Sequence, residues 1–277
     1  NKHELKIRYL ESDKNDVDKR QHLLFIHGLG SSADRWLDIP DALSLYFHTL
    51  AIDLPGFGGS DKPSDMDYYT IEAFSDIIRQ FIDKIRITEE DRGNNRARTI
   101  TLVGHSLGGY IASRIAASDN SNFLEKLVLV DSSGNLEKPT PLLDQYLDAA
   151  MNPSKEKVRK VFEQMVANPL LISDVLVQGF IDRIEKPGSK YAFESSLRNS
   201  ANTQIGIKNL NKIGKKGIPT LIIWGMYDKV IPTQHSQIFR EAIKDSTVII
   251  IPQTGHAPFT EKPALVCEYL HKFLACK

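Results

Sequence analysis

The order of apolar runs along the chain constrains the fold more than any other feature of the sequence. Short runs rich in Leu, Ile and Val, such as residues 22–26 and 100–104, are typical of buried strands. Between them lie segments with helical patterns, such as residues 34–44 and the amphipathic stretch 71–85. Strand–helix–strand alternation with uniformly apolar strands indicates a parallel sheet covered on both faces. We therefore expect an α/β fold with a mostly parallel central sheet flanked by helices.

The alternation is interrupted once, in the second half of the chain. From about residue 133 to residue 213 no convincing buried strand occurs, and four segments have helical patterns. Alternation then resumes and continues into a C-terminal helix with one apolar stripe. The sequence thus predicts a core domain made of residues 1–132 and 214–277, with residues 133–213 inserted as an all-helical cap, or lid.

Composition narrows the class of protein. The chain is 41% hydrophobic and 25% charged with a formal net charge of zero, which argues against nucleic acid or an anionic membrane as a partner. No apolar run is long enough to span a bilayer, and the first residues lack both an apolar secretory core and an initiator Met.

Cys267 and Cys276 fall on one predicted helix about 13 Å apart, too far for a disulfide. Reduced thiols suggest a cytoplasmic protein, and no metal-ligand spacing is present.

The stretch IHGLGSSA at residues 26–33 fits two kinds of site. As G-x-G-x-x-A between a strand and a helix it is similar to a dinucleotide fingerprint, with Asp53 as the later acidic residue. As H-G-x-G it fits a loop that offers a backbone N–H to a developing oxyanion. This stretch alone does not decide between an oxidoreductase and a hydrolase.

The stretch GHSLGG at residues 104–109 favours the hydrolase. It places Ser106 between an apolar strand and a helix, the setting of a G-x-S-x-G nucleophile elbow. A serine on so sharp a turn needs small residues two positions to either side, and Gly104 and Gly108 supply them. The turn would project the hydroxyl at a helix N-terminus, where negative charge is favoured.

A nucleophilic serine needs a base and an acid that orients the base. Asp228 follows the strand PTLIIWG, and His256 follows the strand STVIIIP, so the chain order is Ser, Asp, His. Asp131 also ends a strand and is the alternative acid. His27 and His105 flank the two motifs, and we expect them to shape the loops by hydrogen bonding rather than to react.

Together these segments resemble the capped serine hydrolases of the α/β-hydrolase fold superfamily, the esterase and lipase-like group. The matching segments are HGLGSS, DLPGFGGSDKP, GHSLGG, GMYDKVIP and TGHAPFTEKP, which span nearly all of the chain outside the insertion. The resemblance implies that the backbone amides of Leu29 and Leu107 form the oxyanion hole. It also implies that Asp53 is a fold residue rather than a ribose ligand, which leaves the dinucleotide interpretation with little support.

The expected reaction is hydrolysis of a small-molecule ester or lactone by two-step acyl transfer, with no cofactor and no metal. Carbon–carbon bond hydrolases of ring-cleavage products share this triad, but they usually have Trp after the catalytic His, where this chain has Ala257. Perhydrolase activity is compatible with the same triad, and a non-enzymatic ligand sensor on this fold is the alternative of another class.

The cap is the part of the sequence that we expect to select the substrate. It offers apolar residues for a pocket suited to apolar acyl groups of short to medium length: Leu142, Leu143, Tyr146, Leu147, Phe162, Met165, Leu171, Val175 and Phe180. A pocket dominated by charged residues of the cap would instead favour polar substrates.

Overall fold

The fold is built around one sheet. The computed structural model describes residues 4–12, 21–36, 38–90, 99–120 and 122–275. Their strands are β1 (Tyr9–Glu11), β2 (His22–Ile26), β3 (His48–Ile52), β4 (Ile100–His105), β5 (Leu124–Val130), β6 (Thr220–Gly225) and β7 (Thr247–Ile251). Within the described ranges they form a seven-stranded sheet in the order β1-β3-β2-β4-β5-β6-β7. Only the β1–β3 pair is antiparallel, so the predicted mostly parallel sheet is confirmed.

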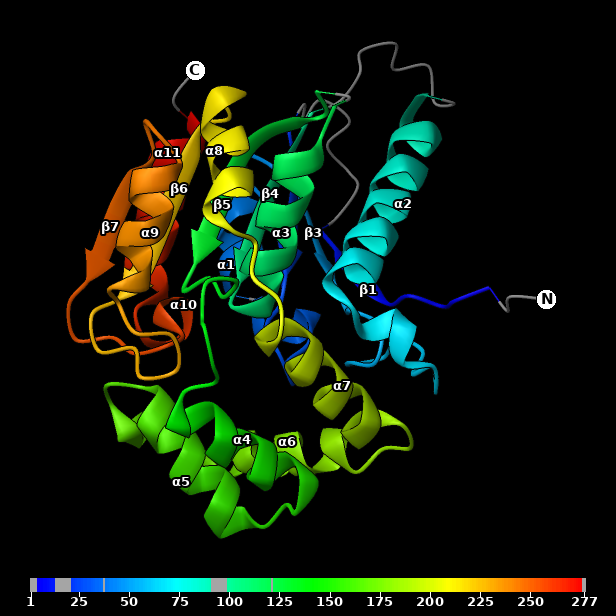
Figure 1. Ribbon diagram of the computed structural model, residues 1–277, viewed down its shortest axis with the longest axis vertical. Coiled ribbons are helices and arrows are strands. Elements are labelled where there is room, and N and C mark those ends of the chain that lie inside the picture. The colour runs from blue at the N-terminus through cyan, green and yellow to red at the C-terminus, as the bar shows by residue number, and fades with distance from the viewer. Residues whose placement is uncertain (1–3, 13–20, 37, 91–98, 121, 276–277) are drawn as a thin grey trace.

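Helices cover both faces of this sheet (Figure 1). Side chains of neighbouring residues on a strand point to opposite faces, so Leu24 and Ile26 join one hydrophobic cluster while Leu23 and Phe25 join the other. The first cluster packs under α2 (Ile71–Glu90), α3 (Leu107–Ser118), α8 (Ile207–Lys215) and α9 (His235–Ala242). The second packs under α1 (Asp38–Leu43), α10 (Pro258–Glu261) and α11 (Pro263–Ala275). The parallel strands therefore end at a common edge, where their loops meet.

The segment between β5 and β6 forms no strand. Its helices include α4 (Pro141–Met151), α5 (Lys155–Met165), α6 (Asp174–Ile184) and α7 (Ser189–Ala201), which lie together beyond one end of the sheet (Figure 1). Three of them begin at a hydroxyl N-cap, since Thr140, Ser154 and Ser173 each accept a hydrogen bond from a backbone amide of the first turn. We call the segment from α4 to α7 the helical insertion. Helix α8, most of which the prediction counts with it, packs against α3 and α9 instead.

The predicted single helix over residues 34–44 is wrong. The structure has a 3-10 turn, η1 (Ala33–Trp36), followed by the separate short helix α1. Pro40 lies in the first turn of α1, where its missing backbone N–H is tolerated. Trp36 is buried and its ring stacks on Phe259 at a centroid distance of 4.4 Å, which fixes η1 against the core.

Two other expectations concern the chain ends and the membrane. Cys276 lies outside the described residues, so the expectation of two reduced thiols on one helix stays a prediction. No helix within the described ranges combines the length and the apolarity needed to cross a bilayer.

Candidate active site

Ser106 occupies the sharp turn between β4 and α3. Its backbone angles are φ 52° and ψ −116°, a conformation that L-residues rarely adopt. The turn depends on the two flanking glycines, because a Cβ atom at Gly104 would overlap the carbonyl oxygen of Gly108, and one at Gly108 would overlap that of Ile26. The serine is thus held in a strained backbone, with its side chain at the N-terminus of α3.

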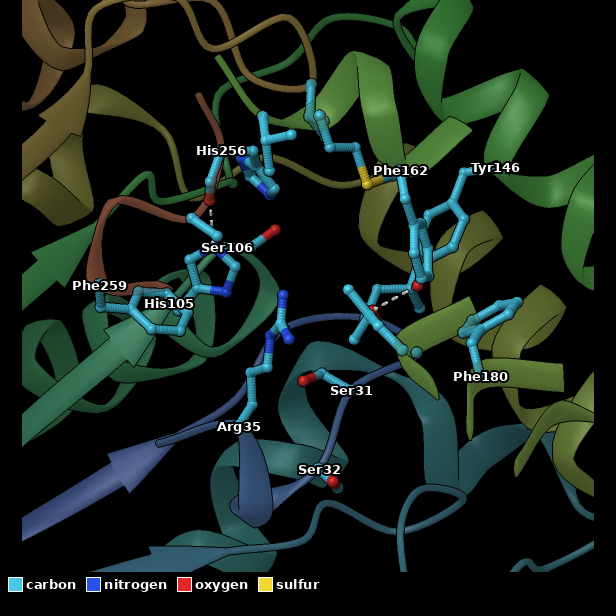
Figure 2. Close-up of a pocket in the computed structure, with 18 of the residues that line it drawn as sticks. Ser31, Ser32, Arg35, His105, Ser106, Tyr146, Phe162, Phe180, His256 and Phe259 are labelled. Atoms are coloured by element: carbon cyan, nitrogen blue, oxygen red, sulfur yellow. Dashed lines mark hydrogen bonds between the residues drawn. The ribbon is translucent and has the colours of Figure 1, made fainter. Parts of the chain in front are cut away.

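Asp228 and His256 meet on the loops that follow β6 and β7. The Nδ1 atom of His256 lies 2.7 Å from Oδ2 of Asp228. The other carboxylate oxygen, Oδ1, accepts hydrogen bonds from the backbone amides of Val230 at 2.7 Å and Ile231 at 3.0 Å. Both side chains are buried, and among the hydrogen bonds of the described residues the imidazole uses Nδ1 and not Nε2. Ser106 and His256 line the same pocket (Figure 2).

Asp131 lies next to this pair but makes different contacts. It directly follows β5, is completely buried, and accepts a hydrogen bond at Oδ1 from the backbone amide of Gly225 at 2.8 Å. Burial and the nearby charge of Asp228 raise the pKa of Asp131 well above its usual range. A protonated Asp131 is a hydrogen-bond donor beside the Asp228 carboxylate. Of the two acids considered from the sequence, Asp228 is the one that contacts His256.

Asp131, Asp228 and His256 are residue types that can bind a metal ion. Ligand atoms of Asp131, Asp228 and His256 lie within 4.8 Å of one another. However, Nδ1 of His256 and Oδ2 of Asp228 are already joined by a 2.7 Å hydrogen bond, which leaves no space for an ion between them. The arrangement fits a hydrogen-bonded relay rather than a coordination sphere.

His27 and His105 support the neighbouring loops. The backbone amide of Leu54 donates to Nε2 of His27, so the proton of this ring is on Nδ1, which lies 2.7 Å from the carbonyl oxygen of Gly28. His105 contacts the carbonyl oxygen of His256 through Nε2 at 2.7 Å. Burial lowers the pKa of both rings, so both are neutral. These contacts fit the expectation that the two histidines shape loops.

The loop that carries His256 is also bound to the helical insertion. The backbone amide of His256 donates to the carbonyl oxygen of Met165 at 2.7 Å. Glu261 joins the two segments, because its carboxylate accepts hydrogen bonds from the backbone amides of Gly255 at 2.6 Å and Ala167 at 2.8 Å. The position of the insertion is therefore coupled to the position of the imidazole.

The two residues expected to offer oxyanion donors are Leu29 and Leu107. Leu29 lines the pocket and Leu107 is the first residue of α3. Among the hydrogen bonds of the described residues, none uses the backbone amide of either one. A Cβ atom at Gly28 would come within 3.0 Å of the Ser106 Cβ, so the backbone before Leu29 runs directly beside the serine.

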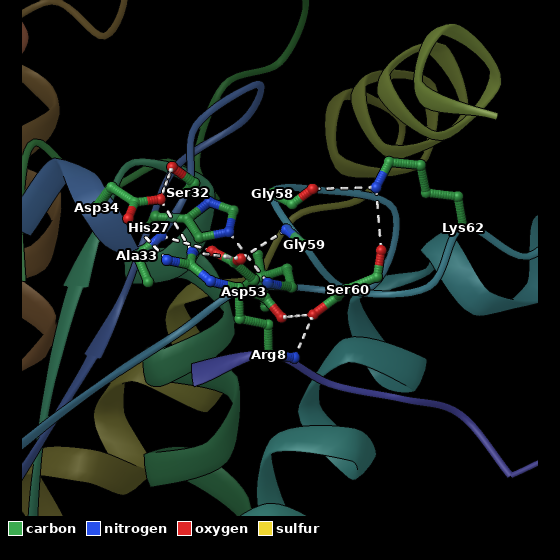
Figure 3. Close-up of polar contacts among 11 residues, drawn as sticks. Arg8, His27, Ser32, Ala33, Asp34, Asp53, Gly58, Gly59, Ser60 and Lys62 are labelled. Carbon is green, nitrogen blue, oxygen red and sulfur yellow. Dashed lines mark hydrogen bonds and ion pairs between the residues drawn. The ribbon is translucent and has the colours of Figure 1, made fainter. Parts of the chain in front are cut away.

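Asp53 is part of the scaffold behind this loop (Figure 3). Its Oδ1 atom accepts from the amide of Ala33 at 2.6 Å, and Oδ2 accepts from the amide of Gly59 and from Arg8, at 2.7 and 2.9 Å. The carboxylate is fully buried, and both oxygens are occupied. It therefore links the loop of Ala33 to the loop of Gly59, and both of its oxygens already accept hydrogen bonds. This agrees with its expected role as a fold residue rather than a ribose ligand.

The pocket itself has a volume of about 260 Å³ and is closed on one side by the insertion (Figure 2). Five of the nine residues predicted to be available for its lining do line it: Leu143, Tyr146, Phe162, Met165 and Phe180. Leu142 and Leu147 pack in a hydrophobic cluster instead, and Leu171 and Val175 are exposed by 42% and 82%, so these four do not line the pocket.

Three charged lining residues were missed from the sequence: Asp34 and Arg35 on η1, and Arg183 on α6. Arg183 follows Leu176 and Phe180 at helical spacing, so it shares their face, and that spacing was the available signal. Arg35 lies three residues after the HGLGSS segment, and no pattern in the sequence marks it.

Comparisons with known proteins show similarity to hydrolases. A family model described as alpha/beta hydrolase fold matches residues 21–263. An uncharacterized hydrolase of Bacillus subtilis (strain 168), YugF, is 27% identical over 92% of this chain and 90% of its own. Lipase 3 of Moraxella sp. (strain TA144) is 29% identical over 90% of this chain and 75% of its own. A solved meta-cleavage product hydrolase from Pseudomonas fluorescens IP01 shares the fold with a TM-score of 0.82, at 23% identity, over 98% of this chain and 94% of that one.

Proposed function

Because the chain belongs to the α/β-hydrolase fold family, we propose that it is a serine hydrolase that cleaves carboxylic esters or lactones with apolar acyl groups. The observation that carries the proposal is the 2.7 Å hydrogen bond between His256 and Asp228, beside a pocket that Ser106 also lines. The similarity to a lipase of Moraxella sp. supports an ester as the substrate.

In the proposed mechanism Ser106 is the nucleophile and His256 the general base. As the hydroxyl attacks the carbonyl carbon, its proton moves to Nε2 of His256, while Asp228 holds the proton on Nδ1 and stabilises the imidazolium. His256 then gives its proton to the leaving alcohol, and an acyl-enzyme remains on Ser106. Water attacks this ester with His256 again as base, which releases the carboxylic acid and restores the serine.

The tetrahedral oxyanion is proposed to accept hydrogen bonds from the backbone amides of Leu29 and Leu107. Two observations support these donors: neither amide is used within the described residues, and Leu107 stands at a helix N-terminus, where negative charge is favoured. The hydrogen bond that His27 makes to Gly28 fixes the loop before Leu29. Loss of one oxyanion donor raises the barrier by about 2.7–4 kcal/mol in enzymes of this kind.

The proposed substrate class follows from the wall of the pocket. Residues 133–213 are proposed to act as a cap, which contributes aromatic and aliphatic side chains opposite the nucleophile. Such a surface binds an acyl chain by removing apolar area from water, at about 25 cal/mol per Å². A pocket of about 260 Å³ suits an acyl group of short to medium length rather than a long fatty chain.

The test is steady-state hydrolysis of p-nitrophenyl esters of increasing acyl length by the wild type and by Ser106→Ala. We expect turnover with an optimum at short to medium chains, and its loss in the variant. Turnover that survives in Ser106→Ala would refute Ser106 as the nucleophile. A folded wild type with no turnover would refute the esterase and favour a carbon–carbon hydrolase or a ligand sensor.

A further inference from the structure

Two arginines enter the pocket that Ser106 lines. Arg35 comes from η1 and Arg183 from α6, so one is contributed by the core and one by the insertion. Figure 2 shows the Arg35 side chain extending from η1 toward Ser106, away from the aromatic side chains of Tyr146 and Phe180. The pocket thus has an apolar wall and a cationic part.

Neither arginine has a carboxylate partner within the described residues. Other arginines of the chain do: Arg8 pairs with Asp34 and Asp53, and Arg159 pairs with Asp174. Asp34 also lines the pocket, but its two oxygens are engaged by the Arg8 guanidinium at 2.7 and 2.9 Å. The acid that lines the pocket with the two arginines is therefore paired with a different cation, Arg8.

The two charges are held at an energetic disadvantage. Burial, followed by the positive charge of Arg183, lowers the pKa of Arg35. The Nε atom of Arg183 is buried and donates no hydrogen bond within the described residues. Placing two cations near each other in a partly enclosed pocket is unfavourable unless an anion joins them, because both desolvation and mutual repulsion oppose it.

We infer that the pocket selects substrates that carry an anionic group, a carboxylate or a phosphate, in addition to the scissile ester. The inference rests on the proposed ester hydrolysis, in which Ser106 performs the reaction while Arg35 and Arg183 select the substrate. Guanidinium groups suit this role since their planar N–H pairs match carboxylate and phosphate oxygens. The hydrocarbon part of the substrate lies against the apolar wall, so the substrate is amphiphilic.

The first experiment compares two esters that differ in one charge. p-Nitrophenyl hydrogen adipate has a free carboxylate at the far end of the acyl chain, and methyl p-nitrophenyl adipate has a neutral ester in its place. We expect kcat/KM of the wild type to be about tenfold or more higher for the acid, a preference that weakens with added salt. Equal values, or a preference for the methyl ester, would overturn the inference without any variant.

The second experiment assigns the preference to residues. In Arg35→Gln and Arg183→Gln, each checked for folding by circular dichroism, the ratio of the two kcat/KM values should fall about tenfold or to unity. Arg198→Gln is the matched control, because Arg198 is on the neighbouring helix α7, is exposed and pairs with Glu194, so its ratio should equal that of the wild type. A ratio that the pocket variants leave unchanged would contradict the inference.

Calorimetric titration of Ser106→Ala with adipate and with inorganic phosphate distinguishes a carboxylate from a phosphate as the preferred anion. Together with the turnover measurements, it also tests the anion site separately from the proposed ester hydrolysis. Binding of adipate, phosphate or both, which Arg35→Gln abolishes, supports the anion site and identifies the preferred headgroup. Binding with no ester turnover by the wild type would keep the anion site and refute the proposed function. Turnover of the neutral ester without anion binding or charge preference would keep the function and refute the anion site.

Discussion

The buried carboxyl of Asp131 leads to a prediction about stability and pH. Asp131 accepts from the amide of Gly225 at Oδ1, while its Oδ2 is buried and accepts no hydrogen bond among the described residues. In Asp131→Asn, the amide oxygen accepts from Gly225, and the NH₂ group stands where the protonated Oδ2 can donate to Asp228. The substitution therefore preserves the neutral hydrogen-bonding pattern and removes only the ability to titrate.

The pH dependence of the unfolding free energy follows from the proton that Asp131 binds in the folded state. Because burial and Asp228 raise the pKa of Asp131 in the folded state, the folded protein holds a proton that the unfolded chain releases above about pH 3.9. The contribution of this group is fully present below that pH and is lost as pH rises toward the folded pKa. In that window the wild type loses about 1.4 kcal/mol of stability per pH unit relative to Asp131→Asn.

The assay is urea denaturation of both proteins between pH 4.5 and 6.5. The difference between their unfolding free energies should grow in favour of the variant as pH rises, by up to about 1.4 kcal/mol per pH unit until the folded pKa of Asp131 is reached. A difference that does not change with pH would refute a protonated Asp131. In the parallel activity assay, Asp131→Asn should keep most of its turnover, while the control Asp228→Asn should lose about 10³–10⁴-fold.

Three further predictions concern the scaffold of the site. Gly108→Ala would press a Cβ atom into the carbonyl oxygen of Ile26, so we expect thermal denaturation to show a loss of about 2–4 kcal/mol, and wild-type stability would contradict the steric argument. Glu261→Ala leaves part-buried backbone amides without an acceptor, so unfolding should become easier by about 1.5–3 kcal/mol. Limited proteolysis should also cut the insertion faster, and an unchanged cleavage rate would speak against the coupling. Asp53→Asn weakens the contact to Arg8, and a loss of about 2–3 kcal/mol in urea denaturation is expected, with no loss counting against a scaffold role.

Local patterns were sufficient to predict much of the architecture. The buried strands are continuous apolar runs, and the Ser106 turn requires glycine at two specific positions. Each of these features can therefore be predicted from a few adjacent residues. Asp228 and His256 each follow an apolar run, which correctly predicted their positions after parallel strands, where the loops converge.

The lining of the pocket could not be predicted in the same way. Apolar residues such as Leu143 and Val175 look alike in the sequence, but only docking of the insertion decides that the first lines the pocket and the second is 82% exposed. The same holds for Arg35, whose position depends on η1. The packing of Trp36 on Phe259, a contact between distant parts of the chain, holds this turn against the core.

The central claim is that Ser106 is an activated nucleophile, and covalent labelling tests it most directly. The protein is treated with a fluorophosphonate, and the adduct is located by intact mass and peptide mapping. The account predicts one adduct, on Ser106, that is absent in Ser106→Ala and forms much more slowly in Asp228→Asn, because His256 then lacks its orienting carboxylate. An adduct on another residue, or a labelling rate that Asp228→Asn leaves unchanged, would contradict the account.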